Sequence, residues 1–289
     1  MQLIDGNLHA KKILEEIKQK VAALPSRKPG LAFIRVGENP ASKIYIQMKK
    51  QKTLEVGMLS IDKELPENTS KEELVDVIAK LNADPKVDGI LVQLPLPPHL
   101  DPFFILEQID PSKDVDGFHP INMGKLLLGQ TGGFIPCTPK GIHKLLVDSE
   151  IDIEGKHVVI VGRSNIVGKP LAALLMQKKA TCNATVTVLH GSSHNLTAIC
   201  QQADILIGAL GKPLFITKEK VKKGAVVIDV GINKITPPGL SKAILVGDVD
   251  FTSVAPLCSY ITPVPGGVGP MTIAMLLSNT LDSYCSFNM

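Results

Sequence analysis

The sequence predicts an α/β protein of two α/β domains, the second a Rossmann-type dinucleotide-binding domain, with a cleft between the two. Three observations support this prediction. Short apolar segments alternate with longer segments of helical periodicity in both halves of the chain. The length of 289 residues is sufficient for two ordinary domains. The apolar segment His157–Val161 leads directly into a turn bounded by glycines, Gly162–Gly168, which is typical of a dinucleotide-binding fold.

In the first half of the chain, helices and strands alternate at a pace that favours a parallel sheet. Helices are predicted over Leu8–Leu24, Asn39–Val56 and Ser70–Leu81, and strands over Leu31–Val36, Met58–Ile61 and Asp88–Leu94. Asn39 and Pro40 suit the cap and the first turn of their helix, and Gly57 ends it. The stretch Asp110–Gly133 has weak periodicity, so we expect an extended active-site loop with a short helix near Met123–Leu128.

The second half repeats this alternation. Strands are predicted over His157–Val161, Thr185–Leu189, Ile205–Gly208 and Val226–Val230, and helices over Pro139–Asp148, Lys169–Lys178, Asn195–Gln202, Lys218–Val221 and Pro270–Tyr284. The last of these helices should return to pack on the first domain. We therefore expect one domain of residues 1–140 plus 262–289, with the dinucleotide-binding domain, residues 141–261, inserted into it.

The composition argues against several classes of protein. A formal net charge of +3 and an aromatic content of 4% do not favour nucleic-acid binding. Five widely spaced cysteines without a Cys/His cluster indicate free thiols and no metal site. No apolar stretch approaches the ~20 residues of a membrane helix, and the N-terminus lacks a secretory pattern. We expect a cytoplasmic protein without a membrane or nucleic-acid partner.

The turn after His157–Val161 departs from the Gly-x-Gly-x-x-Gly fingerprint, because Ser164 replaces the middle glycine and one residue is inserted. It still presents backbone N–H groups at the start of a helix, where anions bind. The next predicted strand ends in His190–Gly191–Ser192–Ser193, without the acidic residue that binds the ribose of NAD. Arg163 suits a 2′-phosphate, so NADP is favoured. The alternative is an α/β domain without a cofactor, with Arg163 on a solvated surface.

Candidate chemical groups in the first half stand on a helix, at a strand end and in a loop. Tyr45 and Lys49 are four residues apart and share a helix face, where a desolvated lysine can act as acid or base. Spacing alone favours an ordinary surface lysine beside a half-buried tyrosine. Gln93 ends a predicted strand, either at a ligand-binding edge or as a turn amide. Asp116 can accept hydrogen bonds from the amino edge of a heterocycle, or belong to an Asp-Gly turn.

Two further observations narrow the class of enzyme. The Tyr-x-x-x-Lys spacing also occurs in short-chain dehydrogenases, but there it follows the dinucleotide turn, whereas here it precedes that turn by more than a hundred residues. The stretch Pro263–Thr272 contains three glycines, which allow a backbone to lie close to a ligand, and Pro270 then opens a helix. We interpret this stretch as a functional loop.

Together these segments resemble the family of the bifunctional methylenetetrahydrofolate dehydrogenase/methenyltetrahydrofolate cyclohydrolase, in its bacterial-type form without a synthetase extension. The resemblance rests on six motifs in the family's order: Tyr45-Ile46-x-x-Lys49, Val92–Pro97, Lys113–Gly117, Pro136–Pro139, Gly162-Arg163-Ser164 and Pro263–Thr272. The motifs cover nearly the whole chain, and the last one is highly specific to the family.

The resemblance implies that NADP+ oxidises 5,10-methylenetetrahydrofolate to the methenyl form, which water opens to 10-formyltetrahydrofolate, a one-carbon donor for purine biosynthesis. It implies catalytic roles for Lys49 as the key group of the hydrolysis, for Gln93, which tunes it, for Tyr45 on the folate ring and for Asp116 on the pterin. It also implies substrate contacts at Pro265, Gly266 and Gly269, cofactor contacts at Gly162, Arg163, Ser164 and Ile232, and a homodimer that binds tetrahydrofolate derivatives. Because the methenyl intermediate is a cation, we expect Lys49 to be neutral in the working complex.

The chain departs from the family's pattern in three places. Gln51 and Thr53 stand where members often have Lys and Cys, with little expected effect. Gly191 stands where members commonly have Ser, which removes a phosphate or ribose contact, so we expect a weaker preference for NADP, with Ser192 or Ser193 as a substitute. Leu210 is a mild change between Ala209 and Gly211.

Three functional hypotheses follow. The first is the bifunctional enzyme. The second, motivated by Gly191, is a cyclohydrolase with weakened dehydrogenase activity. The third is a non-catalytic NADP-binding or regulatory protein, which the set of Tyr45, Lys49, Gln93 and Asp116 argues against, because a binding module needs no such lysine.

Overall fold

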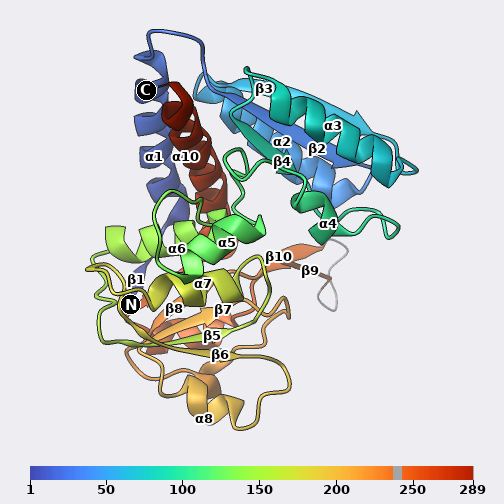
Figure 1. Ribbon diagram of the computed structural model, residues 1–289. Helices are drawn as coiled ribbons and strands as arrows, with labels where there is room; N and C mark the ends of the chain where they lie inside the picture. Colours follow the sequence, from blue (N-terminus) through green and yellow to red (C-terminus); the bar gives the residue numbers. More distant parts are fainter. Residues whose placement is uncertain (237–242, 289) are drawn as a thin grey trace. The chain divides into compact units, whose positions relative to one another are not determined.

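The computed structural model describes residues 1–236 and 243–288, and the chain forms two compact units. Residues 1–10 and 138–272 form what we call the six-stranded unit, and residues 11–137 and 273–289 the three-stranded unit. Both are α/β units, so the predicted fold class is confirmed (Figure 1). The predicted domains, residues 1–140 plus 262–289 and residues 141–261, stay a prediction; by contacts, residues 1–10, 138–140 and 262–272 group with the six-stranded sheet.

The six-stranded unit is built on one sheet in the order β1-β11-β8-β7-β5-β6, and every pair in it is parallel. Its strands are β1 (Gln2–Leu3), β5 (His157–Val161), β6 (Thr185–Leu189), β7 (Ile205–Gly208), β8 (Val226–Asp229) and β11 (Tyr260–Ile261). The chain runs outward from β5 to β6 and then crosses back to β7 on the other side of β5. This reversal is the topological switch point, where α/β sheets bind ligands at the carboxyl ends of their strands.

Burial explains why this sheet could be predicted from sequence. Nearly every residue of β5, β7 and β8 is buried, so these strands appear as continuous apolar segments rather than as alternating ones. The helices of the unit are α6 (Cys137–Asp148), α7 (Gly168–Leu175), α8 (Leu196–Cys200), α9 (Phe251–Val254) and the 3₁₀ turns η1 (Lys218–Lys220) and η2 (Ala255–Leu257). Helices α7 and α8 cover opposite faces of the sheet (Figure 1).

The three-stranded unit contains a parallel sheet in the order β3-β2-β4. Its elements are β2 (Gly30–Val36), α2 (Pro40–Glu55), β3 (Leu59–Leu65), α3 (Lys71–Ala83), β4 (Gly89–Val92), α4 (Pro102–Leu106) and α5 (Pro120–Leu127). The central strand β2 is buried along its whole length, and it packs with α3 in one apolar core. The carboxyl end of β4 leads directly to Gln93, so the sheet delivers that residue to its ligand-binding edge.

Local capping signals set several helix boundaries. The Asn39 side chain accepts a hydrogen bond from the backbone N–H of Ser42 at 3.1 Å, as the sequence predicts for the start of α2. Ser70 and Glu73 form a reciprocal capping box at the start of α3. Helix α5 begins at Pro120, three residues earlier than predicted, because the His119 ring caps it.

The remaining differences arise at short or edge elements. Strand β3 continues to Leu65, beyond the predicted Ile61, because an edge strand with polar exposed residues lacks an apolar signal there. The two-residue strands β1 and β11, the hairpin strands β9 (Asn233–Ile235) and β10 (Ile244–Val246), and α4 were not predicted. Such short elements depend on tertiary pairing rather than on local periodicity.

Two long helices complete the chain, α1 (Gly6–Ala22) and α10 (Val268–Asn288). The later part of α10 belongs to the three-stranded unit, where its buried polar side chains bind backbone carbonyls. Asn279 donates to Val115 O at 2.8 Å, and Ser283 donates to Asp88 O at 2.6 Å. These hydrogen bonds satisfy groups that would otherwise be costly to bury, and they fix the start of the loop that carries Asp116.

Candidate functional site

Lys49, Gln93 and Asp116 come together in the three-stranded unit. The half-buried Lys49 on α2 donates a hydrogen bond from Nζ to Oε1 of Gln93 at 3.2 Å. Gln93 in turn donates from Nε2 to Leu94 O at 2.7 Å, so its amide is held with the oxygen toward the lysine. Tyr45, one turn before Lys49 on α2, is 38% exposed, which leaves its ring available for stacking.

The loop after β4 positions the Asp116 carboxyl group. Burial raises the pKa of Asp116 above that of an ordinary aspartate, while the Lys49 ammonium and the Cys137 thiol beside it oppose this rise. Asp116 is followed by Gly117, whose φ is +80° and whose position leaves no room for a side chain against Pro136. An aspartate at this turn therefore faces a lysine in a partly desolvated environment, an arrangement suited to binding a polar heterocycle beside a base.

Asp114 holds this loop in place and was not predicted as a site residue. Its carboxylate accepts hydrogen bonds from the backbone N–H groups of Phe118 and His119 and from Nδ2 of Asn122, at 3.2, 2.8 and 2.9 Å. Asp114 is 1% exposed. The only sequence signal for its role is its place in the segment Lys113–Gly117, since the three donors follow it within eight residues.

The turn Gly162–Gly168 connects β5 to α7 at the switch point of the six-stranded sheet. A side chain at Gly162 would place its Cβ 2.0 Å from the carbonyl oxygen of Ala209, after β7, and the φ of Gly162 is +141°. A Cβ at Gly168 would lie 2.0 Å from the oxygen of Gly162. Both glycines are therefore required for close packing of the turn. Ser164 stands in place of the middle glycine of the usual fingerprint, and its side chain accepts a hydrogen bond at the start of the helix that follows.

Ser164 shapes the start of α7. Its Oγ accepts a hydrogen bond from the backbone N–H of Val167 at 3.1 Å, which uses one of the donors that a helix N-terminus leaves unpaired. Arg163 is exposed at the same turn and, among the residues that the structure describes, forms no ion pair. An unpaired guanidinium at the carboxyl end of β5, with no carboxylate side chain in the turn after β6, fits the phosphate-bearing ribose of NADP.

The glycine-rich loop Pro263–Gly269 packs against the start of α1 within the six-stranded unit. A Cβ at Gly6 would lie 1.7 Å from the carbonyl oxygen of Gly267, and the backbone N–H of Asn7 donates to Gly266 O at 3.2 Å. Part of the glycine requirement is therefore structural. The same loop reaches Ile232, whose Cδ1 would be 3.6 Å from a Cβ at Gly269, so predicted substrate and cofactor residues lie next to each other.

Two buried aspartates connect the loops after β7 and β8. The Asp248 carboxylate accepts from the backbone N–H groups of Leu210 and Gly211 at 2.6 and 2.8 Å, and from Nδ2 of Asn233 at 2.9 Å. Asp229 accepts from the N–H groups of Gly231, Asp248 and Val249 at 2.9 to 3.0 Å. Sequence reasoning missed both, because their partners are backbone groups of distant segments. The pair determines where Ile232 and the Leu210–Gly211 loop lie.

The buried carboxyl groups of Asp114 and Asp229 should make the free energy of unfolding depend on pH. Burial raises the pKa of Asp114 and of Asp229 to about 7, from an ordinary value of 3.8. Between about pH 4 and about pH 7 each carboxyl group is protonated when folded and ionised when unfolded, so the stability that it contributes is lost as the pH rises through about 7. We expect the free energy of unfolding, measured by urea titration, to decrease from about pH 5 to about pH 8.

The variants Asp114→Asn and Asp229→Asn test this expectation, since neither side chain titrates. Each amide turns its NH₂ group toward at least one backbone N–H, which lowers the absolute stability, so the slope against pH is the readout. We expect a smaller slope in each variant. An unchanged slope in both variants would contradict the assignment of the pH dependence to these carboxyl groups.

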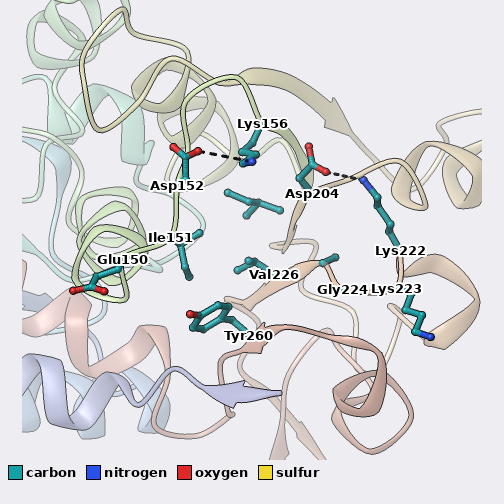
Figure 2. Close-up of a pocket in the computed structure, with 12 residues that line it drawn as sticks. Glu150, Ile151, Asp152, Lys156, Asp204, Lys222, Lys223, Gly224, Val226 and Tyr260 are labelled. Carbon is teal, nitrogen blue, oxygen red and sulfur yellow. Dashed lines mark hydrogen bonds and ion pairs between the residues drawn. The ribbon is translucent and has the colours of Figure 1, made fainter.

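A hollow of about 300 Å³ lies at the amino ends of β5, β7, β8 and β11, at the edge of the sheet opposite Gly162 (Figure 2). Its rim carries the ion pairs Lys156–Asp152 at 3.8 Å and Lys222–Asp204 at 2.7 Å. Because these charges neutralise each other, we assign no chemistry to the hollow. Within the described ranges, no group of three His, Cys, Asp or Glu residues is placed to bind a metal ion, and no helix there has the length and apolar character needed to span a bilayer.

Comparisons with known proteins match the chain over both units. The family model "Tetrahydrofolate dehydrogenase/cyclohydrolase, catalytic domain" matches residues 4–116, and the model "Tetrahydrofolate dehydrogenase/cyclohydrolase, NAD(P)-binding domain" matches residues 136–288. "Bifunctional protein FolD" of Protochlamydia amoebophila is 55% identical over 283 residues, which are 98% of this chain and 97% of that protein.

Solved structures agree with these matches. The bifunctional enzyme FolD, methylenetetrahydrofolate dehydrogenase/cyclohydrolase, from Campylobacter jejuni is 49% identical with a TM-score of 0.94, over 99% of each chain. The methylenetetrahydrofolate dehydrogenase-cyclohydrolase (FolD) of Trypanosoma brucei, solved with NADP cofactor and an inhibitor, is 38% identical with a TM-score of 0.92, over 99% of this chain and 98% of that one.

Proposed function

The chain belongs to the tetrahydrofolate dehydrogenase/cyclohydrolase family, and we propose on that basis how its own residues perform the two reactions. The protein is a bifunctional folate enzyme that oxidises 5,10-methylenetetrahydrofolate with NADP+ and hydrolyses the resulting methenyl form to 10-formyltetrahydrofolate. The observation that supports the residue assignment best is the hydrogen bond from Lys49 Nζ to Gln93 Oε1, with the Asp116 carboxylate beside the same ammonium.

For the hydrolysis, we propose that Lys49 takes a proton from the attacking water. The substrate is a methenyl cation, so a protonated lysine would repel it, whereas a neutral amine can accept the proton as the new C–O bond forms. Gln93 accepts a hydrogen bond from Lys49 Nζ and so directs the amine. Asp116 binds the amino-pyrimidine edge of the pterin, and Tyr45 stacks on the aromatic part of the folate.

For the oxidation, bound NADP+ supplies the acceptor of the hydride that leaves the methylene carbon. The chain's part is to bind and orient both ligands. Gly162 permits the close turn at the end of β5, Arg163 binds the 2′-phosphate, Ser164 sets the start of α7, and Ile232 contacts the cofactor. Pro265, Gly266 and Gly269 form the substrate side of the loop that reaches Ile232.

An assay with 5,10-methylenetetrahydrofolate and each nicotinamide cofactor in turn tests the proposal. We expect reduction of NADP+ in clear preference to NAD+, together with formation of 10-formyltetrahydrofolate. Hydrolysis of added methenyltetrahydrofolate without reduction of either cofactor would favour a cyclohydrolase with weakened dehydrogenase activity, the alternative that Gly191 suggests. Cofactor binding without turnover of either folate would favour a regulatory protein.

The finer assignments also belong to this proposal. We infer a homodimer, a cytoplasmic location and a supply of 10-formyltetrahydrofolate to purine biosynthesis from the family resemblance. Sedimentation equilibrium checks the first of these, since a dimer has twice the mass of the 31.0 kDa chain.

A further inference from the structure

The carboxyl end of β6 is open where a dinucleotide carries its adenosine ribose. Apart from the two chain neighbours, a Cβ at Gly191 would have one heavy atom of the described residues within 4 Å, the Nζ atom of Lys212 at 3.5 Å. Ser193, which the sequence suggests as a substitute ligand, uses its Oγ to accept the backbone N–H of His190 at 2.9 Å and so holds the turn. The Ser193 hydroxyl is thus engaged within the turn, and the Lys212 ammonium faces the open position.

Lys212 reaches Gly191 from the far side of the switch point. It follows β7, and β5 lies between β7 and β6 in the sheet. The backbone before it passes close to the cofactor turn, because Ala209 O occupies the space of a Cβ at Gly162. The lysine thus brings its charge from the end of β7 to the end of β6, on the carboxyl edge that carries Arg163.

The backbone that carries Lys212 is fixed in position. Asp248, which is fully buried, accepts hydrogen bonds from the N–H groups of Leu210 and Gly211, the two residues before the lysine. Gly211 has a φ of +71°, in the left-handed region that glycine adopts without strain. When a ligand binds, only the side chain of Lys212 has to become ordered. The conformational entropy lost on binding is therefore that of a single side chain.

The charge of Lys212 is not neutralised by the protein. Across the two described ranges, no carboxylate lies within ion-pair distance of its Nζ, which instead lies 5.9 Å from the ring centroid of Phe215. A weakly held ammonium at the edge of an open site, on the same carboxyl edge of the sheet as the unpaired guanidinium of Arg163, favours an anion of high charge.

We propose that Lys212 is a second cationic ligand of the 2′-phosphate of NADP, and that the absence of a side chain at Gly191 leaves the space in which the phosphate and the ammonium meet. This inference rests on the proposed use of NADP. It makes Lys212 a specificity-determining residue. It also replaces the expectation of a weakened NADP preference, because the Lys212 ammonium binds the phosphate in place of the hydroxyl that a serine at position 191 would provide.

Isothermal titration with 2′,5′-ADP and with 5′-AMP tests the proposal without turnover, since the two probes differ only in the 2′-phosphate. We expect Lys212→Met to weaken binding of 2′,5′-ADP roughly tenfold or more, the usual effect of one charged hydrogen bond. Binding of 5′-AMP should change less than about twofold, and Lys212→Arg should keep most of the affinity for 2′,5′-ADP because it keeps the charge. The loss in Lys212→Met should shrink as the salt concentration rises.

Two further variants serve as controls. Lys218→Met removes an exposed lysine of the same unit at η1 and should bind both probes as the wild type does. Arg163→Met removes the ligand already assigned to the phosphate and should weaken 2′,5′-ADP selectively. Equal affinity of Lys212→Met and wild type for 2′,5′-ADP, with Arg163→Met weakened, overturns the role of Lys212 alone. A wild type that does not distinguish 2′,5′-ADP from 5′-AMP overturns the use of NADP as well.

Discussion

Replacing Lys49 with methionine is expected to lower the hydrolysis of methenyltetrahydrofolate by at least about 10²-fold, the lower end of what a positioned base contributes. Methionine keeps most of the volume and the apolar stem of lysine, but it cannot accept a proton from water. The dehydrogenase reaction should fall far less, because hydride transfer from the methylene carbon releases no proton. The variant should therefore accumulate the methenyl form when it is given methylenetetrahydrofolate and NADP+.

The measurement follows reduced cofactor and methenyltetrahydrofolate in the same sample. Lys43→Met is the matched control, since Lys43 lies on the same helix α2, is 66% exposed and pairs with Glu38 rather than with Gln93. It should leave both activities unchanged. Full hydrolysis by Lys49→Met would show that the amine is not the base, whereas equal loss of both activities would indicate that Lys49 serves mainly to bind the folate.

Replacing Gln93 should also lower the rate of hydrolysis, but by less than replacing Lys49. Gln93→Leu removes the acceptor of the Lys49 hydrogen bond while leaving the strand end of β4 in place. A lysine that is no longer oriented should still act as a base, but less efficiently. We expect hydrolysis to fall roughly tenfold, as is usual when a positioned group loses its hydrogen-bond partner.

The sequence predicts most of the sheet and the helix carrying Lys49, because buried parallel strands and capped helices leave strong local signals. It also predicts that Gln93 lies at a strand end. It cannot predict the distance between Lys49 and Gln93, since that distance depends on how α2 packs on the sheet. For the same reason, Lys212 could not be connected with Gly191, because the strand order β7-β5-β6 that brings them together is a property of the whole fold.

The aspartates that position the loops were missed for a related reason. Asp229 and Asp248 lie 19 residues apart in the chain and bind backbone N–H groups, which carry no side-chain signature. A Gly-Asp pair after a short strand looks like turn chemistry. The sequence also gives no sign that glycines pack closely around the two carboxylates. A Cβ at Gly231, for example, would lie 2.2 Å from Asp248 Oδ1, so the position has no room for a side chain.

The second large effect is expected at Asp248, where alanine should lower the free energy of unfolding by about 2 to 3 kcal/mol, the range expected when hydrogen bonds to a charged group are lost. The substitution leaves the N–H groups of Leu210 and Gly211 and the Asn233 amide without their acceptor. These donors lie at residues that are half-buried or exposed, so water replaces part of what the carboxylate supplied, and the loss stays below that of a fully buried network. Urea titration at constant pH measures the loss.

Asp248→Asn separates the network from simple packing. The amide oxygen of the new asparagine can accept the hydrogen bonds from the N–H groups of Leu210 and Gly211. Its NH₂ group can donate to the Asn233 side-chain oxygen after the Asn233 amide flips. We therefore expect a loss of only about 1 kcal/mol, comparable to one ordinary hydrogen bond. Asp250→Ala is a control two residues away, where the aspartate caps α9 through Ser253, and it should also cost about 1 kcal/mol.

The functional consequence distinguishes a positioning role for Asp248 from a merely stabilising one. Because the Asp248 carboxylate holds the two residues before Lys212 and the side chain of Asn233 next to Ile232, its loss should weaken NADP more than it weakens folate. We expect Asp248→Ala, assayed at a temperature where it remains folded, to raise the KM for NADP+ roughly tenfold or more, with little change in the KM for methylenetetrahydrofolate. A variant that is less stable but keeps the wild-type KM for NADP+ would show that the loop retains its conformation without Asp248, and that the placement of Lys212 is fixed by the sheet alone.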